Sequence, residues 1–312
     1  MSSTQLTEIP TLGKLYAGAL GSAAKSRLSP SKGTGVLPSD RHVVSGAKVD
    51  LAKLTDFQRL VLHSATDYLP SGYVHTFAFP VAMSLMARED FPLPLLGMVH
   101  LRNTVRHFRP IHYTEPLTVS AWAENLGGHR AGTQVELVAE VTSDDGEVLW
   151  RGRSTYLAKG VFLPKIDRPG ESSGRAEFIP PLPTAMWRLG ADAGRNYARV
   201  SGDFNPIHLS RLSAKALGMK RSLAHGMYLA SRVVSDAVQT HEGPFEWSID
   251  FESPVFLPAT VAVSIHDDDT DTGWSGSTFT GWNPRSQRRH FAGTVRPLET
   301  ASLDGFAAAA RA

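Results

Sequence analysis

The sequence predicts an α+β protein made of two copies of one unit, each a long buried helix followed by an antiparallel sheet. Three observations support this fold class. A largely apolar helical segment precedes several alternating strands in each half of the chain. The halves share a short phrase, Arg109-Pro110-Ile111 and Ser253-Pro254-Val255, whose prolines lie 144 positions apart. A stretch rich in proline and glycine, residues 163–184, separates the two halves.

Composition excludes several classes of protein. Of the 312 residues, 42% are hydrophobic and 20% are charged, which is typical of globular domains and not of disordered chains. No apolar run approaches the roughly 18 residues that a membrane helix needs, so we expect no membrane insertion. A net charge of +2 argues against nucleic acid as the main partner. The absence of cysteine excludes disulfides, thiolate nucleophiles and iron–sulfur clusters, and favours a cytoplasmic location.

The first half of the chain contains a lead-in and one helix-then-sheet unit. Residues 1–48 are rich in Ser, Gly, Ala and Lys without a continuous apolar stretch, so we expect an extended N-terminal lead-in. Residues 49–162 form the first unit. Its patterns predict an amphipathic helix over 50–65, a buried helix over 77–87 that opens near Thr76, and strands alternating from Leu117 to Ala158.

The second half repeats this plan after a linker over residues 163–184. The unit over residues 185–312 begins with an irregular stretch and a short polar helix over 210–217. A largely apolar helix then opens at His225-Gly226. We expect four strands after it, over Phe245–Phe251, Thr260–His266, Trp274–Trp282 and Arg289–Val295, with the two sheets meeting edge to edge.

A loop in the second half carries the residues suited to chemistry. Gly202 permits a left-handed backbone, and Asn205 before Pro206 is disfavoured in a helix, so the segment is irregular. It presents Asp203, Asn205 and His208 within six positions, which is the acid, amide and imidazole set of general acid–base catalysis. The alternative interpretation is structural, with the first two residues making side-chain turns and His208 capping the next helix.

This loop resembles the signature of a known family. The segment Ser201-Gly-Asp-Phe-Asn-Pro-Ile-His208, followed by Leu223-Ala-His-Gly-Met-Tyr-Leu-Ala230, is similar to the MaoC-like, type 2 (R)-specific enoyl-CoA hydratase/dehydratase family. Its two-domain members also resemble this chain at Tyr73-Val74-His75 and at His107-Phe108-Arg109-Pro110. The likeness spans residues 49–297. It implies a double hotdog, in which two long central helices are each wrapped by an antiparallel sheet.

The resemblance also implies roles for individual residues. Asp203 and His208 would form the catalytic dyad, and Asn205 would orient the water or departing hydroxyl. The backbone N–H of Gly226 would hold the thioester carbonyl, a role that suits the unpaired N–H groups of a helix start. The implied reaction is the reversible dehydration of (R)-3-hydroxyacyl thioesters to trans-2-enoyl thioesters, a hydro-lyase reaction of fatty-acid metabolism.

Substrate contacts are expected from both halves. His225 and Met227 flank the helix start and would contact the substrate there. Val81 lies on the buried helix of the N-terminal unit, which would be non-catalytic and would line the acyl tunnel. Arg106 and Arg109 form a basic cluster with Arg102 and His107 and would bind phosphates of the carrier, although half of this cluster is equally explained as solvated surface. Family members with one domain carry a serine where Val234 stands, so substrate contacts along that helix differ here.

The expected ligands are few. The reaction needs no metal or redox cofactor, and no His-Glu-x-x-His pattern is present in the sequence. The substrate would be an acyl-CoA or acyl-carrier-protein thioester, and a homodimer of double-hotdog chains is compatible with the resemblance. Two alternatives stay open, an acyl-CoA thioesterase and a non-catalytic acyl-thioester-binding subunit.

Overall fold

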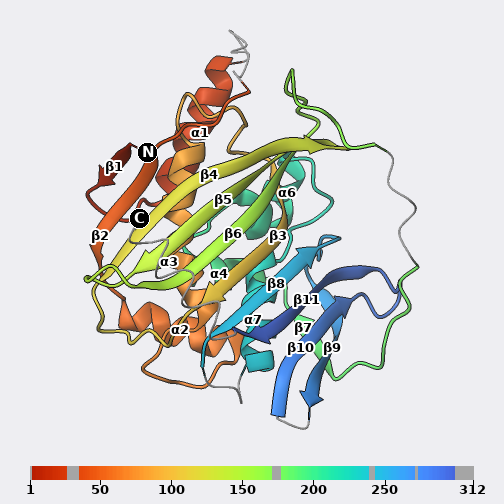
Figure 1. The fold of residues 1–312 in the computed structure, drawn as a ribbon. Coiled ribbons are helices and arrows are strands. Elements are labelled where there is room, and N and C mark those ends of the chain that lie inside the picture. Colours follow the sequence, from red (N-terminus) through yellow and green to blue (C-terminus); the bar gives the residue numbers. More distant parts are fainter. Residues whose placement is uncertain (1, 27–34, 171–176, 239–242, 271–272, 299–312) are drawn as a thin grey trace.

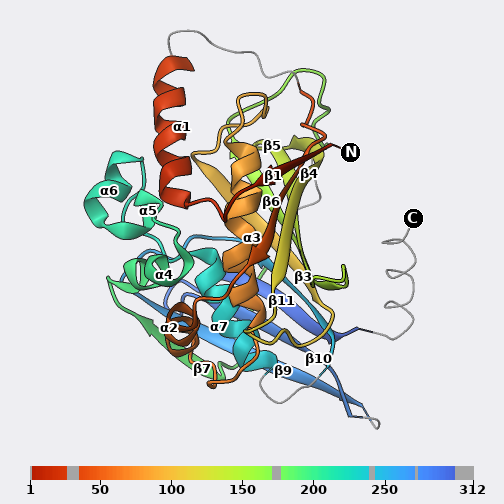
Figure 2. The same ribbon diagram turned by 90° about the vertical axis from the view of Figure 1, so that its left-hand side faces the viewer.

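A computed structural model describes residues 2–26, 35–170, 177–238, 243–270 and 273–298. It contains one eleven-stranded sheet whose helices gather on one side (Figures 1 and 2). The strands are β1 (Ser3–Leu6), β2 (Arg41–Ala47), β3 (Met98–His107), β4 (Leu117–His129), β5 (Gly132–Thr142), β6 (Val148–Lys159), β7 (Ala185–Leu189), β8 (Phe245–Phe251), β9 (Ala259–Thr270), β10 (Gly273–Trp282) and β11 (Arg289–Pro297). The helices are α1 (Leu12–Ser26), α2 (Leu51–Val61), α3 (Ser71–Met86), α4 (Ala193–Ser201), α5 (Pro206–Leu209), α6 (Arg211–Ala216) and α7 (Gly226–Val238).

The strand order confirms the duplication. From β3 outward, the N-terminal half runs β6, β5, β4 and β2; from β8 outward, the C-terminal half runs β11, β10, β9 and β7. Each half therefore has the same connectivity. The two sheets meet edge to edge, as expected, because β3 and β8 pair antiparallel from Arg102↔Asp250 to His107↔Phe245.

The two central helices pack on the concave side of their own half-sheets and against each other. α3 is apolar on nearly every side and fourteen of its sixteen residues are buried, which is the pattern of a helix enclosed by sheet and neighbouring helices. It begins at Ser71, earlier than the opening near Thr76 that the sequence predicts. The early start depends on tertiary contacts, because Ser71 Oγ accepts hydrogen bonds from the indoles of Trp150 and Trp247. α7 opens at Gly226, as expected.

The N-terminal lead-in is not simply extended, so that expectation is wrong. It contains β1, α1 and β2, and β2 joins the sheet beside β4 while β1 pairs with β2 in parallel. An edge strand obtains its backbone partners from far along the chain, which a local pattern does not reveal. The predicted domain boundaries as such stay a prediction. Residues 163–170 and 177–184 contain no helix or strand, and residues 171–176 of the expected linker lie outside the described residues.

One further feature bears on the setting of the protein. Within the described ranges, no helix combines the length and apolar character needed to cross a membrane.

Candidate active site

The loop between α4 and α5 is shaped by its backbone-setting residues. α4 ends at Gly202, whose φ of 75° is left-handed and therefore inexpensive for glycine. Asn205 then caps α5 through its side-chain oxygen, which accepts from Ile207 N–H, and Pro206 occupies the first helical position. Two turns within so few residues bring Asp203 and His208 to the same side of the loop.

Asp203 and His208 lie together, as the sequence predicts. One ligand-type atom from each, together with one from His225, falls within 4.8 Å of the others. His208 Nδ1–H donates to the carbonyl of Leu223 at 3.0 Å, and because a carbonyl can only accept, this bond leaves Nε2 with its lone pair. Burial lowers the pKa of His208, with the charge of Asp203 opposing. The neutral ring can therefore accept a proton at Nε2.

His225 contacts both members of the dyad. Its ring stacks on that of His208 with centroids 3.6 Å apart, and its Nε2–H donates to the main-chain oxygen of Asp203 at 3.0 Å. Its side chain is only 3% exposed, and burial lowers the pKa of His225 to about 3. The predicted substrate contact of His225 is untested, but its position is that of a residue that holds the loop in place.

The three clustered residues do not suit a metal ion. The planes of the two stacked imidazoles are inclined by only 25°, so their nitrogen lone pairs lie in two nearly parallel planes and do not converge well on one point. Both rings also use one nitrogen to donate to a main-chain oxygen. The arrangement suits acid–base chemistry.

The start of α7 supplies a place for an oxyanion. The first N–H groups of a helix, here those of Gly226 and Met227, have no intrahelical acceptor and carry the positive end of the helix dipole. A Cβ at Gly226 would lie 3.0 Å from the ring of Phe251, tighter than an ordinary contact, so the glycine lets this ring lie close to the helix start. Met227 is buried in the core, and its predicted substrate contact stays a prediction.

The N-terminal half contributes side chains that sequence reasoning missed. Tyr16 from α1 donates its hydroxyl hydrogen to Asp203 Oδ1 at 2.8 Å. Burial, and secondarily the charge of Asp203, raises the pKa of Tyr156 on β6. Burial lowers the pKa of His75 on α3 to about 4, against a raising effect of Asp203. Asp203 thus interacts with three residues of the other half; of these, the sequence had pointed only to His75, through its family resemblance.

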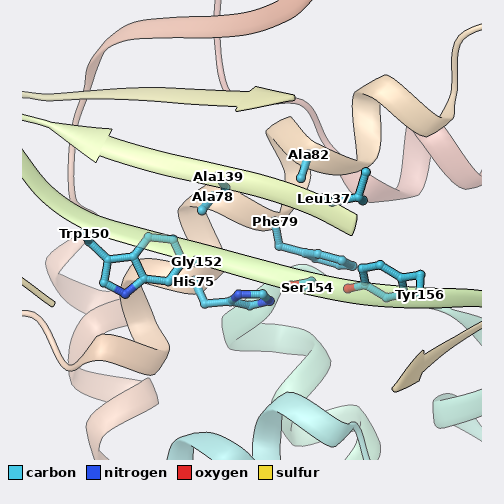
Figure 3. Close-up of a pocket in the computed structure, with 10 residues that line it drawn as sticks. All are labelled: His75, Ala78, Phe79, Ala82, Leu137, Ala139, Trp150, Gly152, Ser154 and Tyr156. Atoms are coloured by element: carbon cyan, nitrogen blue, oxygen red, sulfur yellow. The ribbon is translucent and has the colours of Figure 1, made fainter. Parts of the chain in front are cut away.

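A small cavity in the N-terminal half is lined by two of these residues. It encloses about 10 Å³ between α3 and strands β5 and β6, and its walls are His75, Ala78, Phe79, Ala82, Leu137, Ala139, Trp150, Gly152, Ser154 and Tyr156 (Figure 3). Such a volume holds about one water molecule. Ala82 lines the cavity, whereas Val81, predicted to contact substrate, is fully buried and is not among its walls. An acyl chain would have to displace a side chain such as Phe79 to enter.

The predicted phosphate-binding arginines are already paired with carboxylates. Arg106 Nε lies 2.5 Å from Glu246 Oε2. Arg109 Nη2 lies 2.9 Å from Glu115 Oε2, and Arg109 Nε lies 2.9 Å from Glu147 Oε2. A phosphate would have to compete with these carboxylates.

These arginines also lie at the far end of β3 from the dyad. The rings of His100 and Phe251, whose centroids are 5.0 Å apart, mark the end of the β3–β8 junction next to Gly226. Arg106 follows six positions later along β3, which corresponds to about 20 Å in a strand. His107 is buried, and burial lowers its pKa to about 4, so it is not part of a basic surface. A contact of these arginines with the phosphates of the carrier stays a prediction.

Comparison with known proteins identifies the family of this chain. The family model described as "MaoC like domain" matches residues 175–280, which include the whole Asp203–His208 loop and the start of α7. The chain is 31% identical over 278 residues to 3-hydroxyacyl-thioester dehydratase X of Mycobacterium tuberculosis, covering 88% of this chain and 96% of that protein. The chain belongs to the MaoC-like dehydratase family.

Solved structures of this family agree with the fold. The crystal structure of HtdX of Mycobacterium tuberculosis superposes with a TM-score of 0.71 at 29% identity, covering 83% of this chain and 100% of that one. A second Mycobacterium tuberculosis protein, described as having a double hotdog fold, gives a TM-score of 0.50 at 14% identity over 83% of this chain and 96% of its own. The double hotdog expected for this MaoC-like dehydratase is confirmed.

The duplicated fold shows why one half of the MaoC-like dehydratase carries the dyad loop. α2 and α4 both end in a left-handed cap, at Leu62 with φ 60° and at Gly202 with φ 75°. The chain then reaches an equivalent isolated bridge at Tyr68 and at Leu223. Six positions separate cap and bridge in the first half and twenty-one in the second. The dyad thus lies in an insertion that the N-terminal half lacks.

Proposed function

We propose that this MaoC-like dehydratase catalyses the reversible dehydration of (R)-3-hydroxyacyl thioesters to trans-2-enoyl thioesters. The observation that carries the proposal is the placement of Asp203 and His208 together beside the open N–H groups at the start of α7. An acid–base pair next to an oxyanion site is what removal of a proton beside a thioester carbonyl requires. The name of its 31% identical relative, a 3-hydroxyacyl-thioester dehydratase, supports the same reaction.

The thioester carbonyl binds at the start of α7 in this proposal. The N–H of Gly226 donates to the carbonyl oxygen, and the helix dipole stabilises the negative charge that develops there as the enolate forms. Phe251 packs over the glycine and excludes water from one side. A low local dielectric strengthens the interaction of the N–H with the charged oxygen.

The dyad moves two protons. In hydration, a water molecule held by Asp203 and His208 forms its O–C bond to Cβ and loses one proton to the dyad, while the dyad delivers one proton to Cα. The net change is addition of one water across the double bond. Asn205 uses its Oδ1 as the cap of α5, so its NH₂ group is the part that can orient this water. His208 Nε2 accepts a proton because its Nδ1 is committed to Leu223.

The substrate is an acyl-CoA or acyl-carrier-protein thioester in this proposal. Each proton and each stabilising charge in the steps above is supplied by a residue of the chain, so the mechanism calls on no metal or redox cofactor. We propose that the acyl group extends toward the cavity beside α3, because His75 and Tyr156 both line this cavity and interact with Asp203. The N-terminal unit then shapes the acyl site and performs no chemistry itself.

Incubation of the purified protein with crotonyl-CoA tests the proposed reaction. We expect the ultraviolet absorbance of the conjugated enoyl thioester to fall without release of free thiol. Asp203→Asn and His208→Ala should each lower kcat/KM by about 100- to 10,000-fold, the usual contribution of positioned acid–base groups. His63→Ala is the matched control, because His63 directly follows the equivalent left-handed cap in the other half.

Two results would contradict the proposal. Release of free thiol from a saturated acyl-CoA would instead identify a thioesterase. Near wild-type turnover by either dyad variant would show that the dyad is misassigned.

A further inference from the structure

The N-terminal helix α1 brings a side chain into the site. Leu12 and Tyr16, one turn apart on α1, are 2% and 7% exposed, so this face of the helix is buried. Figure 2 shows α1 beside α3, and the two helices are in contact. The segment is held to the sheet through β1, which pairs with β2 from Ser3↔Arg41 to Leu6↔Val44. Tyr16 is therefore placed by an anchored element.

The hydroxyl of Tyr16 binds one oxygen of the Asp203 carboxylate. It donates to Oδ1 at 2.8 Å, and the backbone N–H of Asn205 donates to the same oxygen at 3.2 Å. The other oxygen, Oδ2, lies 3.7 Å from His225 Nε2, beyond hydrogen-bond distance. The two donors together hold Oδ1 and leave Oδ2 as the oxygen available to a reacting group.

We infer that Tyr16 is a positioning residue of the reaction, which fixes the rotation of the Asp203 carboxylate so that Oδ2 faces the water. This inference rests on the proposed function. A hydrogen bond to an ionised carboxylate is stronger than one between neutral groups, and it restricts the carboxylate to one orientation. The N-terminal segment, expected from its sequence to be a lead-in, thereby completes the active site of the second half.

The ionisation state of Tyr16 suits a permanent donor. Burial, followed by the charge and hydrogen bond of Asp203, raises the pKa of Tyr16 above its ordinary value. The phenol keeps its proton throughout the neutral range and does not compete with the dyad for one. Its role is to hold the carboxylate, and it exchanges no proton with the substrate.

Tyr16→Phe separates this role from a structural one. Without the hydroxyl, we expect kcat on crotonyl-CoA to fall about 10- to 100-fold with KM changed less than about threefold, since a hydrogen bond to a charged group is removed. A kcat near the wild-type value, or a KM that rises as much as kcat falls, would overturn the inference.

Tyr73→Phe is the matched control. Tyr73 is equally buried, and its hydroxyl donates to the carbonyl of Asp50 at 3.2 Å, away from the dyad. Tyr73→Phe therefore also removes one hydrogen bond that a buried tyrosine hydroxyl donates. We expect kcat and KM of this variant to match those of the wild type.

A double-mutant cycle tests the contact without reference to activity. Tyr16→Phe should lower the urea midpoint of the wild-type protein but leave that of Asp203→Ala nearly unchanged, because the acceptor is already absent. Equal shifts in both backgrounds would show that Tyr16 does not act through Asp203. A wild-type protein without hydratase activity would refute the proposed function, whereas additive shifts in the cycle would refute the role of Tyr16 alone.

Discussion

The protonation state of His208 is set by its surroundings at the scale of single residues. Burial makes the charged imidazolium unfavourable, and the nearby Asp203 carboxylate compensates for only part of this cost. The hydrogen bond from Nδ1 to Leu223 also selects the tautomer with a free Nε2. A base with these properties is unprotonated at neutral pH and is poised to accept a proton.

The pH dependence of hydration follows from the lowered pKa of His208. The pKa of His208 lies below the ordinary 6.5, so the ring stays neutral as the pH falls from alkaline values to 6.5 and becomes protonated only below it. Protonation occupies Nε2 and removes the base. We therefore expect kcat/KM for crotonyl-CoA to be level above pH 6.5 and to decline at lower pH. Circular dichroism at each pH should confirm that the protein is folded, and a half-maximal rate at or above pH 6.5 would contradict the assignment.

At the scale of elements, α3 presents some of its side chains to the cavity and buries others away from it. Its Phe79 and Ala82 side chains face the cavity beside β5 and β6, while Val81 is fully buried away from that cavity. The cavity is too small for an acyl chain until a wall residue moves. Chain-length preference should therefore depend on the size of the side chains on one face of this helix.

Substitutions on the two faces of α3 test this dependence. Phe79→Ala removes bulk from the cavity and should raise kcat/KM for octenoyl relative to crotonyl thioester, since each buried methylene contributes about 0.8 kcal/mol. Ala82→Leu fills the cavity and should have the opposite effect while leaving crotonyl turnover largely intact. Val81→Ile is the control, because it adds bulk on a face that does not line the cavity. Parallel changes for both chain lengths would show that this cavity does not house the acyl chain.

At the scale of the whole molecule, several histidines are buried in the neutral form. Burial lowers the pKa of His75 and His107 to about 4 and that of His225 to about 3. In the unfolded chain each would titrate near 6.5. Below that pH the unfolded state binds protons at these histidines and the folded state does not, so the free energy of unfolding decreases as the pH falls.

We expect acid to destabilise the fold steeply. Both states are neutral at these histidines above pH 6.5, so stability there does not depend on them; between 6.5 and about 4, each one costs about 1.4 kcal/mol per pH unit. Urea midpoints measured from pH 8 to pH 5 should fall on the acid side. His107→Phe should weaken this pH dependence, because it removes one such group while keeping a ring against Phe245. Stability that is constant or rises toward acid pH would refute this account.

Local patterns in the sequence by themselves determined most helices and strands of the two units and the presence of a reactive loop. They missed β7 and α4, because the sequence suggested an irregular stretch at the start of the second unit. The period of the apolar residues placed β4, β8 and α7 near their observed bounds, because this period depends on neighbours only a few residues away. Asp203, Asn205 and His208 could be found for the same reason. They share one short loop whose shape is set by Gly202 and Pro206.

Only the tertiary structure decided what surrounds that loop. Tyr16 lies 187 positions from Asp203, which it binds, and Tyr156 on β6 also interacts with Asp203. Arg106, which sequence reasoning grouped with the substrate's phosphates, lies at the end of β3 far from the dyad and is paired with Glu246. These contacts follow from the strand order, from the β3–β8 junction and from the packing of α1, and they join residues between 47 and 187 positions apart. A pattern with a reach of a few residues carries no information about pairings of that range.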